Sequence, residues 1–277
     1  MSKKLLRLFP TPTEYVDLKG LYLKEKLYLR GTHEKPFIYA NFLSSLDGRI
    51  ALDDETGIPY LPKSLTTPDD FRLFLELHAQ ADCLITHGGY LRSLSEGRLG
   101  NILQVGVHPQ GDDLLAWRLS KGLPRQPAIV IASGSLEFPL PDWLFESGQS
   151  ILIATGHDAD PEKVKKWEDL GIEVIRAGSG KDVNGGVLAD SLSVRGFKTL
   201  YLIAGPRMLE TMVREKRLTV LFQTLSLQLL GGEAFHSMVS GPVLGEAGRM
   251  RMVSLYHDPD SGCGLGQWFA KFDASCN

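Results

Sequence analysis

The residues best placed for ligand chemistry lie in Ile203-Ala204-Gly205-Pro206-Arg207-Met208, where an apolar run meets a glycine and then a helix start. A glycine there lets a ligand approach the backbone, and the first helical turn offers free N–H groups and a positive dipole end. Proline suits the first helical position, because its missing N–H would have no partner there. The segment predicts a site for an anion such as a dinucleotide pyrophosphate, with Arg207 adding a cation. A plain strand-to-helix turn is the alternative interpretation.

A second polar feature follows the apolar run that begins at Phe37 and leads into Asp47-Gly48. The two-residue period of a strand puts Asn41, Leu43 and Ser45 on one face, so that Asn41 is available to the amide of a ligand. Asp-Gly is also a common turn pair. A hairpin turn without functional meaning is therefore an equal alternative.

His78 shares one face of an expected helix with Phe71 and Leu75. A histidine on an apolar face is more often a hydrogen-bonded core residue than a catalyst. The other histidines show no metal-ligand spacing; they are His33, His87, His108, His157, His236 and His257. The cysteines Cys83, Cys263 and Cys276 form no CxxC pair, so neither zinc nor a disulfide framework is expected. GxSxG and GxxxxGK[ST] motifs are missing, which gives no support to a hydrolase or a P-loop NTPase.

Short apolar runs alternate with helical segments, a pattern typical of α/β proteins. The expected buried strands are Phe37 to Leu43, Cys83 to Thr86, Ala128 to Ala132, Ser150 to Ala154, Glu173 to Arg176 and Thr199 to Ile203. The expected helices are Pro68 to Ala81, with Thr66 or Thr67 as its cap, Pro161 to Leu170 after Asp160, Leu188 to Val194, and Pro206 to Glu215. Three later runs are expected to complete the sheet as antiparallel strands: Thr219 to Leu229, Arg251 to Tyr256 and Gln267 to Phe272.

Composition narrows the class of protein further. The chain has 277 residues, 43% of them hydrophobic, which is enough for a full core. Its formal net charge of −3 gives no reason to expect a nucleic-acid partner. It has neither an apolar stretch of about 20 residues nor a signal-like N-terminus, so we expect a cytoplasmic protein with no membrane partner. Residues 1–36 lack a clean period and are interpreted as an extension of a main domain over residues 37–277.

Taken in order, these segments resemble the RibD C-terminal domain family, the reductase domain of riboflavin-biosynthesis enzymes. The resemblance runs from about Phe37 to Phe272 and rests on several ordered motifs. These are Asn41 to Ala51 with its SLDG turn, Thr66 to Asp70 followed by Leu77 to Asp82, Pro127 to Ser133, Ile151 to Thr155, Leu170 to Val174, Leu202 to Leu209, and Leu229-Leu230-Gly231-Gly232.

The resemblance implies a dihydrofolate-reductase-like α/β domain: a mixed, mostly parallel sheet flanked by helices, with antiparallel C-terminal strands. It implies NADPH across the carboxyl ends of the strands, in agreement with the general rule for open α/β sheets. The implied cofactor contacts are Leu43 and Ser44 near the nicotinamide, Ser133 and Thr155 toward the adenosine, and Gly205, Pro206, Arg207, Met208 and Leu209 at the phosphates. Asp47 and Asn41 are the expected catalytic residues, and His78 and Tyr90 the expected substrate-binding residues.

The departures from the family pattern fall mostly on the substrate side. His78 stands where the family has an arginine that reaches the substrate phosphate, Tyr90 where it has a threonine, and Ile203 where it has an acid. We therefore expect an NADPH-dependent reductase, homodimeric as the family commonly is, that reduces a small heterocyclic or sugar-derived substrate. One alternative is the true riboflavin-pathway reductase, with His78 and Arg92 or Arg98 as phosphate ligands. Another is a non-catalytic nucleotide-binding protein of the same fold. The chain contains neither HxE nor PCxxC, so a zinc deaminase half is not expected.

Overall fold

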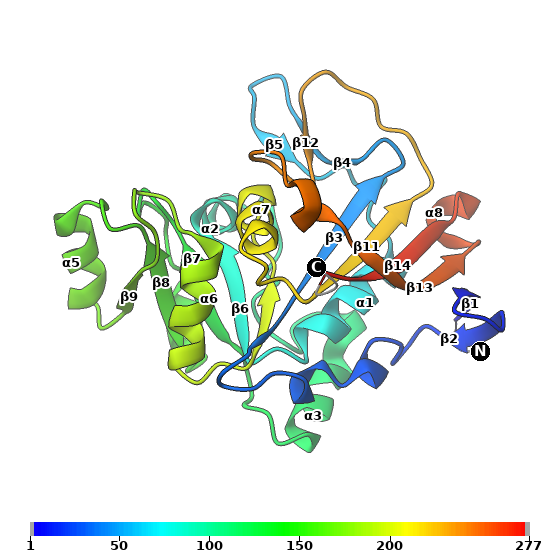
Figure 1. Ribbon diagram of the computed structural model, residues 1–277, viewed down its shortest axis with the longest axis horizontal. Helices are drawn as coiled ribbons and strands as arrows, with labels where there is room; N and C mark the ends of the chain where they lie inside the picture. The colour runs from blue at the N-terminus through cyan, green and yellow to red at the C-terminus, as the bar shows by residue number, and fades with distance from the viewer. Residues whose placement is uncertain (1–2, 275–277) are drawn as a thin grey trace.

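An eleven-stranded sheet runs through the whole molecule in the order β2-β1-β13-β14-β11-β3-β10-β6-β7-β8-β9. The computed structural model describes residues 3–274 (Figure 1). Neighbours from β11 to β9 pair in parallel, and the strands from β14 to β2 are antiparallel. The parallel part comprises β11 (Val220–Ser226), β3 (Phe37–Ser45), β10 (Thr199–Leu202), β6 (Cys83–His87), β7 (Ala128–Ala132), β8 (Ile151–Thr155) and β9 (Glu173–Arg176). The antiparallel part comprises β14 (Gln267–Asp273), β13 (Arg251–Asp258), β1 (Lys4–Phe9) and β2 (Glu14–Asp17).

A second, small sheet has the order β12-β4-β5, formed by β12 (Phe235–Ser237), β4 (Arg49–Asp53) and β5 (Pro59–Tyr60). It stands at the top of Figure 1, beyond the carboxyl ends of β3 and β11. The turn at Asp47-Gly48 leads from β3 into this sheet and has the positive φ of 78° at Gly48 that favours glycine. The chain thus leaves the central sheet at this turn rather than folding back on β3 as a hairpin.

Helices cover both faces of the central sheet and enclose two apolar layers. One layer lies under α1 (Pro68–His78) and α2 (Gly88–Ser95), and the other under α6 (Gly185–Val194) and α7 (Pro206–Arg214). The remaining α-helices of the described chain are α3 (Asp112–Ser120), α4 (Asp142–Glu146), α5 (Pro161–Asp169) and α8 (Ser261–Gly264). Thr67 caps α1 by accepting from the Asp70 N–H at 3.1 Å, and Asp160 caps α5. No helix in the described part of the chain is long and apolar enough to span a membrane.

The expected α/β class is confirmed, with one difference in how the last third of the chain joins the sheet. β11 pairs in parallel with β3 and antiparallel with β14, so it is the strand at which the direction changes. Its burial pattern has few accessible positions, as expected for a strand with a neighbour on each side. The sequence pattern alone does not determine whether a strand pairs in parallel or antiparallel, because that depends on which strand lies next to it in the sheet.

The first residues add to the same sheet although their sequence has no clean period. β1 pairs with β13, and β2 pairs with β1 at the edge. The chain then passes along α1 in a crossing segment with two short 3-10 turns, Leu23–Glu25 and Leu27–Leu29, before it enters β3. Leu5 and Leu27 are completely buried, so this segment shares the main core.

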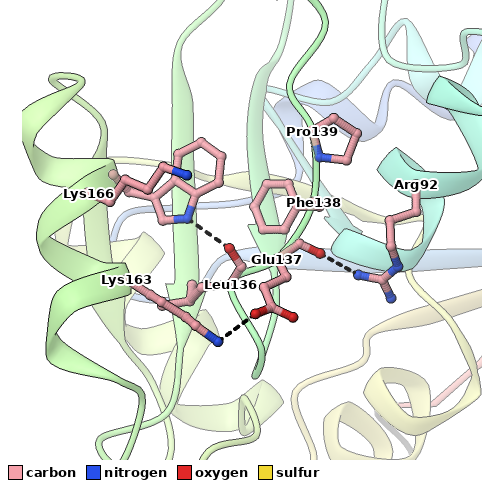
Figure 2. A pocket seen from close by; sticks show the side chains of 8 residues that line it. Arg92, Leu136, Glu137, Phe138, Pro139, Lys163 and Lys166 are labelled. Atoms are coloured by element: carbon pink, nitrogen blue, oxygen red, sulfur yellow. Dashed lines mark hydrogen bonds and ion pairs between the residues drawn. The ribbon is translucent and has the colours of Figure 1, made fainter.

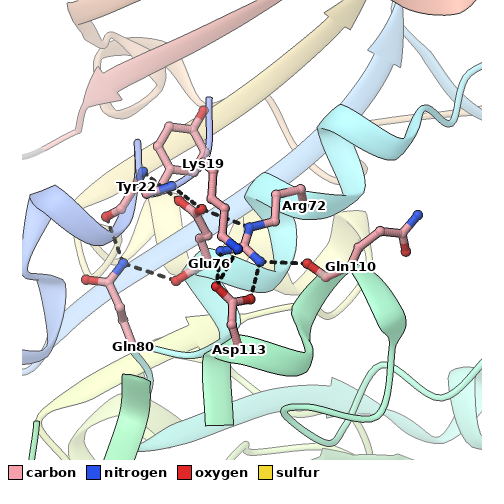
Figure 3. Close-up of polar contacts among 8 residues, drawn as sticks. Lys19, Tyr22, Arg72, Glu76, Gln80, Gln110 and Asp113 are labelled. Atoms are coloured by element: carbon pink, nitrogen blue, oxygen red, sulfur yellow. Dashed lines mark hydrogen bonds and ion pairs between the residues drawn. The ribbon is translucent and has the colours of Figure 1, made fainter. Parts of the chain in front are cut away.

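A buried carboxylate fastens this crossing segment to α1 (Figure 3). Glu76 accepts from the backbone N–H groups of Gly20, at 2.5 Å, and Tyr22, at 3.0 Å. Arg72 donates to Glu76 at 3.0 Å and to Asp113 of α3 at 2.5 Å. Because Glu76 is fully buried, its charge depends on these partners.

We expect Glu76→Ala to lower the free energy of unfolding by about 3 kcal/mol, because it leaves two backbone N–H groups and part of the Arg72 guanidinium unsatisfied. Urea unfolding followed by tryptophan fluorescence measures the change. Glu55→Ala, at an exposed position, is the control and should stay within about 0.5 kcal/mol of wild type. Equal stability of the two variants would contradict the fastening role of Glu76.

Candidate functional site

The carboxyl ends of β6, β7 and β10 meet the start of α7 around a cavity of about 660 Å³. Parallel strands bring their carboxyl ends to one edge, where open α/β sheets bind ligands. The lining residues are His87, Ala132, Ser133, Gly134, Asp182, Val183, Ala204, Gly205, Pro206, Arg207, Met208, Glu210, Thr211, His236, Ser240, Gly241 and Pro242.

Gly205 is the residue at which β10 gives way to α7. It occupies the cap position of the helix, no side chain caps the first turn, and Pro206 follows as the first helical residue. A Cβ built on Gly205 would meet only His87 Nε2, at 4.0 Å. The open side of the glycine therefore faces the cavity, and the helix start presents its positive dipole end to whatever lies there.

A tightly packed loop brings Asp182 to the opposite wall. Gly156 donates its N–H to the Lys181 carbonyl at 3.1 Å, and a Cβ on Gly156 would come within 1.9 Å of the Gly180 carbonyl oxygen. Only glycine permits this approach at the end of β8. The loop then passes beside Gly134, so that Asp182 and the residue after it reach the cavity.

The charges around the cavity favour an anion only near α7. Arg207 lies 3.6 Å from Asp182, and both side chains are more than four-fifths exposed, at 84% and 82%. Such an exposed pair is weak and leaves the guanidinium available to a ligand. Burial, with a smaller effect of Arg92, lowers the pKa of His87, so its imidazole is neutral at neutral pH. The Nε2 of His236 hydrogen-bonds to the Asp53 carboxylate at 2.7 Å.

Five of the predicted cofactor contacts come together in this lining: Ser133, Gly205, Pro206, Arg207 and Met208. Leu209 and Thr155 are buried behind it, Leu209 within the core under α7 and Thr155 at the end of β8. Leu43 and Ser44 lie on β3 outside the lining, and Ser44 accepts from Gln223 at 3.1 Å.

Sequence reasoning missed several lining residues. His87 ends a strand just before Gly88-Gly89, a signal of the same kind as Gly205, and was open to prediction. Asp182 and the segment Ser240 to Pro242 come from loops with no comparable pattern, and His236 lies on the three-residue strand β12. Within residues 3–274, no group of three or more His, Cys, Asp or Glu side chains is arranged to hold a metal ion.

Asp47 anchors a loop outside the cavity lining. Its carboxylate accepts from the Ser45 hydroxyl and from the N–H groups of Leu230 and Gly231, the latter at 2.9 Å, and pairs with Arg49 at 2.6 Å. The Ser45 and Gly231 hydrogen bonds are the main reasons why its pKa is lowered to about 2. An ionised carboxylate with these partners holds the β11–β12 connection against the end of β3, and it has no proton to donate at neutral pH.

Asn41 and Tyr90 lie in different surroundings. Asn41 is half-buried in the middle of β3. The Tyr90 hydroxyl donates to the Gly100 carbonyl at 2.8 Å and accepts from the Ile102 N–H at 3.0 Å. Burial raises the Tyr90 pKa to about 12, and this side chain supports the loop after α2 rather than the cavity.

His78 is in the core instead of at a phosphate site. It is 1% exposed, and neither ring nitrogen has a hydrogen-bond partner of ordinary geometry among the described residues. Burial, then the charge of Arg118, lower the pKa of His78 to about 3. A neutral, enclosed imidazole supplies no charge to a substrate phosphate.

We expect His78→Leu to match or exceed wild type in thermal stability, because it removes a buried imidazole that makes no hydrogen bond of ordinary geometry. His78→Arg should lower the free energy of unfolding by at least about 3 kcal/mol, because it buries a cation near Arg118. Thermal unfolding of the two variants checks both.

The pH dependence gives a second check. A histidine with a lowered folded-state pKa contributes stability that is present above about pH 6.5 and is lost as the pH falls toward 3. His78→Leu should therefore lose less stability than wild type between pH 7 and pH 4.5. A stable His78→Arg protein that gains affinity for phosphate would contradict the core placement.

A second cavity, of about 440 Å³, lies between α5 and the loop after β7 (Figure 2). Phe138 and Trp167 stack along one wall, with ring centroids 4.9 Å apart. Lys163 pairs with the Glu137 carboxylate at 2.7 Å, and Arg92 donates to the Glu137 carbonyl at 2.8 Å. Arg92 thus already has a backbone partner, and Arg98, away from this wall, pairs with Glu96.

Solved structures of reductases share the fold of this chain. A pyrimidine reductase-like protein from Corynebacterium diphtheriae is similar with a TM-score of 0.62 at 18% identity, over 86% of this chain and 91% of that one. The riboflavin biosynthesis reductase of Saccharomyces cerevisiae gives a TM-score of 0.54 at 12% identity, over 92% of this chain and 98% of that one.

A third similar structure is the deaminase/5-amino-6-(5-phosphoribosylamino)uracil reductase of Thermotoga maritima, with a TM-score of 0.55 at 17% identity. The match covers 87% of this chain and 57% of that longer protein. The model of the RibD C-terminal domain family matches residues 36–260. The chain belongs to the RibD C-terminal domain family.

Proposed function

We propose that the chain is an NADPH-dependent reductase whose cofactor phosphates bind at the start of α7. The observation that supports this most is the open side of Gly205, which faces the cavity at an uncapped helix N-terminus. Such a turn is suited to a pyrophosphate, because a side chain there would displace it and the helix dipole favours its charge.

The residues present fit a dinucleotide. The cavity volume of about 660 Å³ lies within the range of small-molecule sites, and Arg207 provides an exposed cation beside the helix start. Ala132, Met208 and Pro242 give apolar surface for rings. When bound, NADPH supplies a hydride. The protein binds and orients it and keeps water from the reacting carbon.

For the substrate we propose an aminopyrimidine of the 5-amino-6-(5-phosphoribosylamino)uracil kind. Family membership and the activity that names the Thermotoga maritima relative support this class. The core position of His78 argues against this residue as a phosphate ligand in the riboflavin-pathway reaction. The homodimer and the cytoplasmic location stay predictions.

Gly205→Val tests the cofactor site, because the protein around Gly205 has room for the valine side chain. That side chain would occupy the space that we assign to the cofactor phosphates. We expect the affinity for NADPH, measured by fluorescence titration, to fall more than about tenfold. Gly100→Val is the matched control, since a Cβ there meets nothing within 4 Å and Gly100 is not in the cavity lining. Unchanged affinity in a folded Gly205→Val protein would place the phosphate site elsewhere.

A further inference from the structure

Asp70 is a buried carboxylic acid that takes no part in the cavity lining at α7. It lies in the first turn of α1 with 7% of its surface exposed. Its N–H donates to the cap residue Thr67, but its Oδ1 is buried without a hydrogen-bond partner in the described part of the chain. A buried carboxyl oxygen without a partner is costly, and such atoms often belong to sites completed by a ligand.

Three other polar side chains are linked to Asp70 in turn: Thr224 lies close enough to act on the pKa of Asp70, and Asp70 and Asn41 both act on the pKa of Tyr201. Together the four are called the Asp70 cluster: Asn41 of β3, Asp70 of α1, Tyr201 of β10 and Thr224 of β11. The Tyr201 hydroxyl is fully buried and makes no hydrogen bond of ordinary geometry within residues 3–274, although Asn41 lies close enough to act on its pKa.

Asn41 is the member of this cluster that solvent reaches, since Asp70, Tyr201 and Thr224 are buried. The alternation of β3 puts Asn41 and Leu43 on the same face as Tyr39, whose hydroxyl donates to the Leu77 carbonyl of α1 at 2.7 Å. Asn41 and Leu43 are only half-buried, because the pairing of β10 with β3 ends at Leu202 and Ala40. A small polar molecule therefore has access to the α1 face at this point.

The cluster is also next to the cavity at α7. The parallel register pairs Leu202 with Ala40, which brings the following residues, Ile203 and Ala204, level with Asn41 and Phe42. Ala204 lines the cavity, and Asn41 belongs to the cluster. A cofactor in the cavity and a substrate at the cluster would thus meet across the end of β10.

We propose that Asp70 donates the proton in the reduction of the substrate, and that Asn41 and Thr224 orient the polar edge of the pyrimidine. This inference rests on the proposed function. Reduction of a carbonyl or imine adds a hydride to carbon and a proton to oxygen or nitrogen. The hydride and its electron pair come from the reduced nicotinamide, which is oxidised. The proton comes from the Asp70 carboxyl, which becomes a carboxylate and is protonated again by water.

The surroundings of Asp70 keep it protonated to a higher pH than an ordinary aspartate. Burial raises its pKa to about 6, and the nearby Thr224 opposes the shift. The titratable groups that feel its charge are Tyr22 of the crossing segment and Tyr201 of β10, whose pKa values burial raises well above their ordinary range. Next to it on α1, Asp69 is engaged with Lys3 at 3.7 Å.

The test compares wild type, Asp70→Asn and the matched control Asp69→Asn, with NADPH and 5-amino-6-(5-phosphoribosylamino)uracil as the probes. We expect Asp70→Asn to lower kcat/KM by at least about a hundredfold, with the NADPH dissociation constant within about twofold of wild type. Asp69→Asn should keep kcat/KM within about threefold of wild type. Wild-type kcat/KM should fall as the pH rises through about 6, and the residual activity of Asp70→Asn should lack this fall.

Thermal stability gives a readout that does not depend on turnover. An aspartate with a raised folded-state pKa contributes stability that is complete below its ordinary pKa of 3.8 and is lost as the pH rises through about 6. Asp70→Asn should therefore match or exceed the Tm of wild type at pH 7.5. A purely structural carboxylate would instead give a lower Tm.

The outcomes separate this inference from the proposed function. If wild type reduces the probe and Asp70→Asn does so within about threefold, Asp70 is not the donor, while the reductase function stands. A lower Tm for Asp70→Asn at pH 7.5, together with weaker NADPH binding, would make Asp70 a structural residue. If wild type binds NADPH but leaves the probe unreduced, the assigned proton transfer to this substrate is overturned. Failure of wild type to bind NADPH overturns the proposed function and this inference with it.

Discussion

The pairing of β10 between β3 and β6 is the constraint on which the rest of the structure depends. Leu200, Tyr201 and Leu202 are fully buried, so this short strand has apolar contacts on both faces. Its register fixes where the chain leaves the sheet at Gly205 to begin α7. The same strand presents Tyr201 to the α1 face. One buried strand thus sets the positions of both the cavity at α7 and the Asp70 cluster.

Local sequence signals predicted the elements around this strand well. The strands Ala128–Ala132 and Glu173–Arg176 have the expected bounds, and the start of α7 at Pro206 follows from a glycine and a proline after an apolar run. These features depend on neighbouring residues, so they can be read from the chain. The first residues were harder, because β1 gains its place only by pairing with β13, near the other end of the sequence.

The candidate site was predictable only where it is made of such local turns. Asp182 reaches the cavity through a loop and His236 through the short strand β12, and the course of each depends on contacts with distant parts of the chain. Asp70 illustrates the same limit, since an acid after a helix cap is commonly an exposed partner of the helix dipole. Its burial arises from β10 and β11, which the sequence of α1 does not encode. Asp47 shows the converse: a conspicuous turn residue whose carboxylate anchors the Leu230-Gly231 backbone.

The cofactor side and the substrate side of the molecule therefore differ in how closely they follow the family pattern. The turn at Gly205 follows the family pattern. On the substrate side, His78 lies in the core and Ile203 stands where the family has an acid. We assign the missing carboxyl group to Asp70 on the facing helix. Substrate chemistry then belongs to the α1 face and cofactor binding to the α7 end, on the two sides of one strand.

A crystal structure of the protein with NADPH tests most directly whether the cofactor binds at the start of α7 and the substrate at the α1 face. We expect the pyrophosphate beside Gly205 at the start of α7, and the nicotinamide near the end of β10, toward Asn41 and Asp70. Phosphates bound at the Phe138 and Trp167 wall, or a nicotinamide pointing away from β10, would contradict it.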